Sequence, residues 1–245
     1  MVHYLESRPL VVPDQAVRSV PVLLSDSKGL RLQQVQEKKS LPLVFLCKRG
    51  ASSKELVELL EHKLPLLLQE YKNPITVYFW GGTCDITKKQ GKFIDIRGKL
   101  GDIIPAVIRN LHRAKDFVLS HNCRIKFIGV PIYLVSLYND VKGHLNPTVF
   151  LDSDKEVEFQ VDLLNKHIEE INTALGRNTL KFNADLRDTR RGKKRHYFEL
   201  LPDGVHPSHL LAQKWLRRLE LDIVRECYLP TDTLEVDDQE FLAFQ

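Results

Sequence analysis

Long apolar segments, closely spaced cysteines and glycine-rich phosphate loops are all missing from this chain of 245 residues. Its longest apolar runs are broken by charges well short of the roughly 20 residues that a membrane-spanning helix needs. The first nine residues lack an apolar core behind a basic end, so we expect no signal peptide. The four cysteines have neither the spacing of a disulfide framework nor that of a zinc site. These absences favour an intracellular protein, cytoplasmic or nuclear, with reduced thiols, no membrane span and no bound metal.

The remaining composition is typical of a soluble globular protein, with 28% charged and 43% apolar residues. The length fits one large domain, which we place at residues 20–228. An N-terminal extension of residues 1–19 would precede it, and an acidic tail of residues 229–245 would follow it. No pattern in the chain indicates an oligomeric state.

Basic residues are concentrated in one segment, 187–196, although the formal net charge of the chain is only +4. A run of this kind can bind nucleic acid or another anion through charge alone, and a solvated surface loop is the alternative. We expect the segment to be exposed and mobile because almost nothing apolar anchors it. The candidate anion or nucleic-acid contacts are Arg187, Arg190, Arg191, Lys193, Lys194 and Arg195.

Apolar, β-rich runs alternate with helical patterns along the chain. Strands are predicted over residues 20–24, 43–47, 75–80, 124–130 and 179–182. Helices are predicted over 29–38, from Ser52 or Ser53 to a bend or break at Pro65, over 104–119, over 157–175, and from Pro207 onward. This alternation predicts an α/β fold, a three-layer α/β/α sandwich around a mostly parallel sheet. Ligands bind such sheets at the carboxyl ends of the strands.

Two polar groups follow predicted strands far apart in the chain. Ser27 comes just after the first strand, and Asp203 and His206 come after the fifth, beyond the basic segment. A carboxylate three residues before a histidine can orient its ring, and the ring can then activate a serine. Each residue also has a plainer interpretation, as an N-cap or turn serine, a turn aspartate and a surface histidine. The combination predicts a serine hydrolase with Ser27, Asp203 and His206 as its triad.

Four segments together resemble the blocks of the SGNH (GDSL-type) hydrolases, from about Val20 to Cys227. They are Ser25-Asp26-Ser27, the run 48–53, Gly82-Thr83-Cys84-Asp85, and Asp203-Gly204-Val205-His206. The resemblance implies a five-stranded sheet with a flavodoxin-like strand order. It implies hydrolysis of a small ester without a cofactor. It also implies an oxyanion hole built from the N–H groups of Ser27 and Gly50. The first and third of these segments, with the sequences SDS and GTCD, also resemble SGNH-like domains in open reading frames of animal mobile elements.

Cys84 is the main departure from that family, which has an asparagine at this position. A thiol is only a weak hydrogen-bond donor, and losing one oxyanion donor costs about 2.7–4 kcal/mol of transition-state stabilisation. We therefore expect low esterase activity. Alternatively, Cys84 is a buried small hydrophobe or a second nucleophile, and Gly50 only permits a turn with positive φ. The competing function is a degraded scaffold that binds nucleic acid or a partner protein.

Overall fold

Two strands at the centre of the protein are buried along their whole length. The computed structural model describes residues 17–37, 41–98, 102–188 and 195–228. Within them, β1 (Val20–Ser25) and β3 (Ile75–Trp80) lie side by side in parallel, with β2 (Val44–Cys47) and β6 (Arg124–Phe127) outside them. Near-continuous apolar runs are what a parallel sheet covered on both faces requires.

The strand order β2-β1-β3-β6 is flavodoxin-like, as predicted. In the register, Leu24 of β1 lies between Leu46 of β2 and Phe79 of β3. The predicted fifth strand is reduced to a single parallel bridge between Ile128 and Leu180. The mostly parallel sheet is confirmed, with four full strands and this bridge at the place of the fifth.

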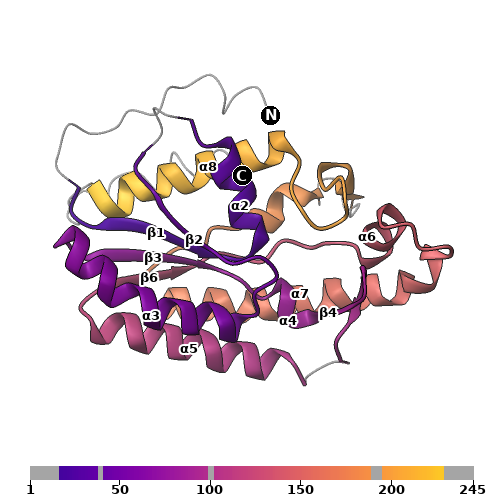
Figure 1. The fold of residues 1–245 in the computed structure, drawn as a ribbon, viewed down its shortest axis with the longest axis horizontal. Coiled ribbons are helices and arrows are strands. Elements are labelled where there is room, and N and C mark those ends of the chain that lie inside the picture. Colours follow the sequence, from indigo (N-terminus) through magenta and orange to yellow (C-terminus); the bar gives the residue numbers. More distant parts are fainter. Residues whose placement is uncertain (1–16, 38–40, 99–101, 189–194, 229–245) are drawn as a thin grey trace.

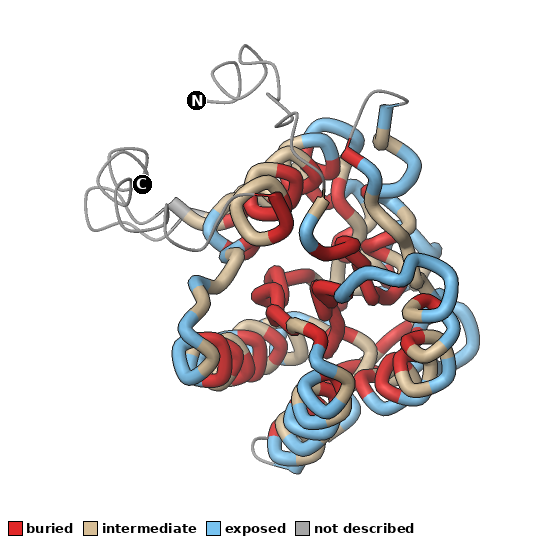
Figure 2. Tube along the Cα trace, turned by 90° about the vertical axis from the view of Figure 1, so that its left-hand side faces the viewer, coloured by how far each residue is buried: buried red, intermediate tan, exposed pale blue. Residues whose placement is uncertain are grey.

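Helices cover both faces of the sheet, which confirms the three-layer sandwich (Figure 1). One layer holds α2 (Ser27–Val35) and α8 (His209–Ile223). The other holds α3 (Ser53–Tyr71), α5 (Ile104–Ser120) and α7 (Leu151–Ala174). Figure 2 shows the buried residues gathered in the sheet and on the helix faces turned toward it.

Helix α3 begins at a capping box in which Ser52 and Glu55 each accept from the other's backbone N–H. Its buried face carries Leu56, Leu60 and Leu64. Of the predicted bend or break at Pro65, the break is wrong, because the helix continues to Tyr71. Packing of the apolar stripe on both sides of the proline outweighs the one backbone hydrogen bond that proline removes.

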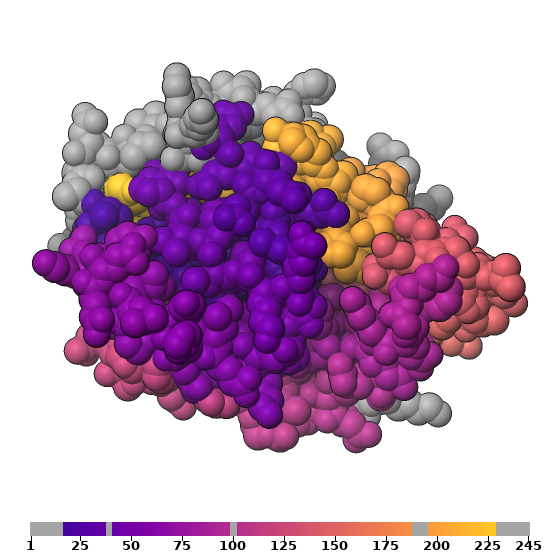
Figure 3. Space-filling model, viewed as in Figure 1, coloured from indigo at the N-terminus to yellow at the C-terminus, as the bar shows by residue number. Residues whose placement is uncertain are grey.

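Helix α7 is longer than predicted, since it begins at Leu151 rather than at residue 157. The added turns are polar and give no helical apolar pattern, but Asp152 and Asp154 in the first turn suit the positive end of a helix dipole. Just before it, α6 (Val135–Val141) and the 3₁₀ turn η1 (Pro147–Phe150) form a projection at one end of the protein (Figure 3).

Several short elements were not predicted, because their sequences lack a regular apolar period. They are α4 (Thr83–Ile86), the hairpin of β4 (Thr87–Gln90) and β5 (Phe93–Ile96), the 3₁₀ turns η2 (Phe182–Leu186) and η4 (Phe198–Leu200), the pair β7 (Arg187–Asp188) and β8 (Arg195–His196), and a π-helical turn η5 (Val224–Tyr228). Among the described residues, no helix is both long and apolar enough to span a bilayer.

Candidate active site

Three of the predicted site residues follow the carboxyl ends of three neighbouring strands. Ser27 comes two residues after β1, Gly50 three residues after β2 and Cys84 four residues after β3. Because parallel strands end at the same edge of the sheet, the loops that carry these residues lie at one edge. Ser27, at the start of α2, is also brought into contact there with the loop that carries Asp203 and His206.

Ser27 is the first residue of α2, and the turn before it is held firmly. Asp26 is the N-cap, and its Oδ1 accepts from the backbone N–H of Lys28 at 2.9 Å. Gly29 allows the helix to lie directly on the sheet, since a Cβ there would meet Cys47 Sγ and Ser25 Cβ at 2.6 Å. The Ser27 N–H, in the first turn of α2, has no partner within the helix. It is therefore free to bind an anion at the positive end of α2.

His206 lies between Ser27 and Asp203 and contacts both. Its Nε2 is 2.8 Å from Ser27 Oγ, and its Nδ1 is 2.8 Å from Asp203 Oδ2. The other oxygen of Asp203 accepts from the backbone N–H of His206 at 2.7 Å and of Val205 at 3.1 Å. These bonds fix the loop and the plane of the ring together.

The loop conformation requires Gly204, which has φ +78°. A Cβ there would meet Leu134 O at 2.6 Å and Tyr138 N at 2.8 Å. In turn, the backbone N–H of Leu134 donates to Gly204 O at 2.8 Å. The start of α6 therefore supports the loop that carries Asp203 and His206.

The tautomer of His206 follows from the state of Asp203. Burial alone would raise the pKa of Asp203, but the hydrogen bonds and charge of His206 lower it to about 2. The carboxyl is therefore ionised at neutral pH and can only accept hydrogen bonds. In a neutral ring, Nδ1 must then carry the hydrogen, which leaves Nε2 free to accept from the Ser27 hydroxyl. This arrangement can remove a proton from Ser27.

Gly50 lies in a turn closed by a hydrogen bond from Ala51 N–H to Lys48 O at 3.2 Å. Its φ of +68° at the third position of this turn is the conformation that favours glycine. Gly50 is exposed, and a Cβ there would meet nothing within 4 Å. Its N–H has no acceptor among the described residues, so it is available to a ligand.

Cys84 lies in the short helix α4, which follows β3 through two glycines. Burial raises the pKa of its thiol to about 12, and the carboxylate of Asp26 adds to the rise. The thiol is therefore protonated at neutral pH. This argues against Cys84 as a nucleophile, because the reactive form of cysteine is the thiolate.

Lys28 is a further residue of this site, not predicted from the sequence, and its side chain is only 2% exposed. Its ammonium lies 2.6 Å from Asp26 Oδ2 and 2.6 Å from Thr83 Oγ1. It also lies 5.6 Å from the centre of the Trp80 ring. Lys28 thus ties the turn before Ser27 to the residue before Cys84. Its place on a short polar helix gives no sign of this burial in the sequence.

Asp85 fixes the other side of the Cys84 segment. Its carboxylate accepts from the backbone N–H of Ser53 at 2.7 Å and from its hydroxyl at 2.8 Å. Asn110 Nδ2 donates to the same hydroxyl at 2.8 Å. Asp85 therefore links the start of α3 to α4, a structural role like that of Asp26.

The basic segment is only partly described. The expectation of exposure is wrong for Arg187, which is 17% exposed and pairs with Asp162 at 2.6 Å and Glu158 at 3.3 Å on α7. Its pairing with helix acids could not be read from the local charge run. The short ladder β7–β8 aligns Asp188 with Arg195. Arg190, Arg191, Lys193 and Lys194 lie outside the described residues.

The four cysteines are free thiols. Within the described part of the chain, no group of three or more His, Cys, Asp or Glu side chains is arranged to hold a metal ion. The chemistry that these side chains can perform without added groups is acid–base and nucleophilic.

The fold is similar to that of several solved protein structures. No family model matches the sequence, and no curated protein sequence is similar to it. Solved structures do match. A candidate acylhydrolase from Bacteroides fragilis superposes with a TM-score of 0.60 at 12% identity, covering 92% of this chain and 94% of that one. The lipase/acylhydrolase from Enterococcus faecalis gives a TM-score of 0.58 at 13% identity, with coverage of 87% and 99%.

A third similar structure is the psychrotrophic esterase EstA from Pseudoalteromonas sp., inhibited by monoethylphosphonate. Its TM-score is 0.51 at 15% identity, and the match covers 85% of this chain and 97% of that one. At such identities the likeness is one of fold. The chain has the α/β fold that these acylhydrolases and esterases share, the fold of the SGNH hydrolases.

Proposed function

We propose that this protein is a serine hydrolase of carboxylic esters, with Ser27 as nucleophile, His206 as general base and Asp203 as its orienting carboxylate. The observation that carries the proposal is the unbroken chain of two 2.8 Å contacts from Ser27 Oγ through the His206 ring to Asp203 Oδ2. A surface histidine and an N-cap serine would not need this alignment. The fold shared with acylhydrolases supports it independently.

The reaction would proceed in two stages. Ser27 Oγ attacks the ester carbonyl while His206 Nε2 takes its proton, and the protonated ring then gives that proton to the departing alcohol. Water next attacks the acyl-serine, with His206 again removing and returning a proton. Asp203 holds the ring and stabilises its charged form throughout. No step needs a cofactor.

The developing oxyanion would be bound by the N–H groups of Ser27 and Gly50. Cys84 would stand at the position of a third donor, where its protonated thiol would supply only a weak hydrogen bond. We therefore propose low activity, on esters with a small acyl group. The competing proposal, a non-catalytic module that binds nucleic acid, loses one of its contacts because Arg187 is already paired with two acids.

The test is turnover of para-nitrophenyl acetate by the purified protein and by Ser27→Ala. We expect slow hydrolysis that is abolished by Ser27→Ala, with Ser208→Ala as a matched control that leaves it intact. Ser208 caps α8, so its substitution affects helix stability rather than chemistry. Equal rates for the wild type and Ser27→Ala would overturn the proposal. Retention on heparin without any turnover would favour the binding module.

A further inference from the structure

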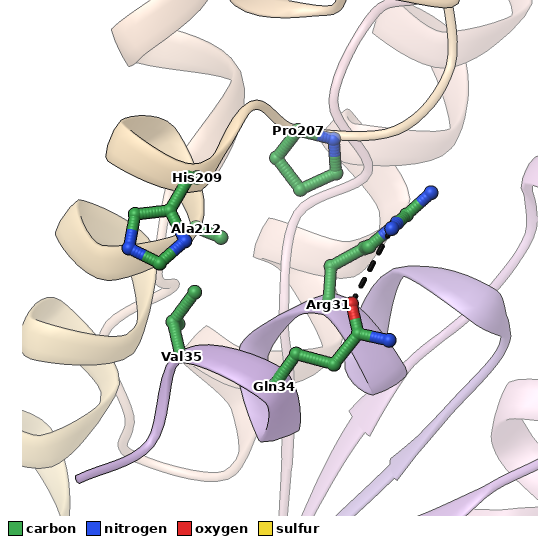
Figure 4. Close-up of a pocket in the computed structure, with 6 residues that line it drawn as sticks. All are labelled: Arg31, Gln34, Val35, Pro207, His209 and Ala212. Carbon is green, nitrogen blue, oxygen red and sulfur yellow. Dashed lines mark hydrogen bonds between the residues drawn. The ribbon is translucent and has the colours of Figure 1, made fainter.

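A hollow of about 100 Å³ opens between α2 and the start of α8. Figure 4 shows its lining, with side chains of α2 below and those of Pro207 and α8 above. Pro207 and Ala212 are buried and Val35 is half-buried, so they form an apolar floor. The hollow has room for a few water molecules or one small polar group. Its lining residues are Arg31, Gln34, Val35, Pro207, His209 and Ala212.

The hollow adjoins the candidate active site along both helices. Arg31 is four residues after Ser27, one turn farther along the same side of α2. Pro207 directly follows His206, which contacts Ser27 Oγ. In the proposed reaction His206 must reach the oxygen of the departing alcohol. The alcohol portion of the ester therefore lies on the His206 side, next to Pro207 in the lining of the hollow.

The lining carries cationic and neutral donor groups and no carboxylate. The guanidinium of Arg31 has one hydrogen bond, to the neutral Gln34 Oε1 at 3.3 Å, and no acid among the described residues pairs with it. Arg31 is an exposed residue, and Figure 4 shows its guanidinium pointing away from Val35 and His209. His209 adds a ring that can donate from a nitrogen, and Gln34 adds its amide. Such a set of donors over an apolar floor suits a carboxylate or phosphate.

We propose that the hollow is a subsite for an anionic group on the alcohol portion of the substrate, with Arg31 as its main contact and His209 and Gln34 beside it. This inference rests on the proposed function and makes it more specific. The preferred substrates are then acyl esters in which the alcohol is a hydroxy-carboxylate or a phosphorylated alcohol, rather than neutral alkyl esters. Arg31 determines specificity and takes no part in proton transfer.

Two acetate esters of equal size separate this role from catalysis. In para-acetoxybenzoate the leaving group carries a carboxylate, and in para-acetoxybenzamide it carries a neutral amide. We expect Arg31→Gln to lower kcat/KM for the benzoate about tenfold relative to the benzamide. Added salt should reduce the wild-type preference in the same direction. Arg109→Gln, which removes an exposed arginine on α5, should leave the ratio unchanged.

Binding to the Ser27→Ala protein makes the subsite testable without turnover. There, Arg31→Gln should weaken binding of the benzoate, measured by calorimetry, and leave the benzamide unaffected. If neither ester is hydrolysed but this difference in binding appears, the proposed function fails and the subsite stands. If Arg31→Gln changes neither the ratio of rates nor the binding of the benzoate, the subsite is refuted.

Discussion

The two sides of the candidate active site differ in how completely their polar groups are hydrogen-bonded. On the proton-transfer side, every side-chain nitrogen and oxygen of Asp203, His206 and Ser27 has a partner at 2.7 or 2.8 Å. On the proposed oxyanion side, the N–H of Gly50 lies in an exposed turn, and Cys84, at the third position that the resemblance implies, carries a protonated thiol rather than an amide. In the proposed reaction, one side is arranged for proton transfer, and the other would be short of a donor.

This difference allows the contributions of proton transfer and of oxyanion binding to be measured separately. The supports of the oxyanion side remain in place, because Lys28 joins its segment to the serine turn and Asp85 joins it to α3. In the proposed site, the geometry would thus be maintained while one donor is missing. A protein of this kind should still form an acyl-serine, but slowly, because stabilisation of the oxyanion is often the largest single contribution to catalysis.

The largest effect should come from the proton-transfer side. His206→Ala removes the base and should lower kcat for an activated acetate ester by about 10³–10⁴-fold. Cys84→Ala, on the other side, removes only a weak donor and should change kcat by less than about tenfold. Stopped-flow or long-time spectrophotometric assays of the two variants compare the sides directly. Similar losses for both would contradict the distinction.

The next effect tests the link between the two sides. Lys28→Met leaves the fully buried carboxylate of Asp26 without its ion-pair partner, and we expect it to lower the free energy of unfolding by about 3–5 kcal/mol. Lys48→Met is the matched control, since its pair with Glu55 is exposed and should contribute at most about 1 kcal/mol. Urea unfolding followed by circular dichroism measures both. A small effect of Lys28→Met would mean that the linkage is unimportant.

Repair of the oxyanion side should give a smaller change, in the opposite direction. Cys84→Asn restores an N–H donor and should raise kcat by about 10²-fold. Cys84→Ser, which has a hydroxyl of similar size, should raise it less. Steady-state assays with the same ester give the comparison. If Cys84→Asn is no faster than the wild type, the loop lacks the geometry that the resemblance implies.

The smallest effect is a difference in pH response. The pKa of Asp203 is lowered to about 2 in the folded state, against about 3.9 in an unfolded chain. Its contribution to stability is therefore fully present above about pH 4 and is lost as the pH falls toward 2, by about 2 kcal/mol in all. Asp203→Asn should remove this part of the acid sensitivity, measured by urea unfolding between pH 2 and 6. Asp140→Asn, an exposed substitution, should retain it.

Asp85 should respond in the opposite sense. Burial raises its pKa, and the two hydrogen bonds from Ser53 only partly offset that rise. Its ionised form is therefore disfavoured by folding, and this penalty is relieved as the pH falls. As the pH falls, the contribution of Asp203 to the free energy of unfolding should therefore decrease, while that of Asp85 should increase.

The central architecture could be predicted because it depends on long, regular signals. The buried strands 20–25 and 75–80 are nearly continuous apolar runs, and the alternation with helices leaves few topologies to consider. The hairpin at 87–96 was missed because its alternation is interrupted by lysines and glutamine. The strand at 179–182 was overestimated because only Leu180 reaches the sheet.

The contacts of the candidate site that could not be predicted from the sequence have a different origin. Contacts between distant segments cannot be read from either segment alone. The burial of Lys28 depends on Thr83 and Trp80, more than 50 residues away, and the pairing of Arg187 depends on acids of α7. The contact between Ser27 and His206 could be anticipated only because two short motifs were interpreted together.

Covalent labelling by a serine-directed phosphonate tests the central claim most directly. The protein is incubated with an excess of a para-nitrophenyl alkylphosphonate, and the adduct is located by peptide mass spectrometry. We predict one adduct, on Ser27, formed at a similar rate in Cys84→Ala and absent from His206→Ala under the same conditions. A labelled Cys84, or labelling of Ser27 that is indifferent to His206→Ala, would contradict the account.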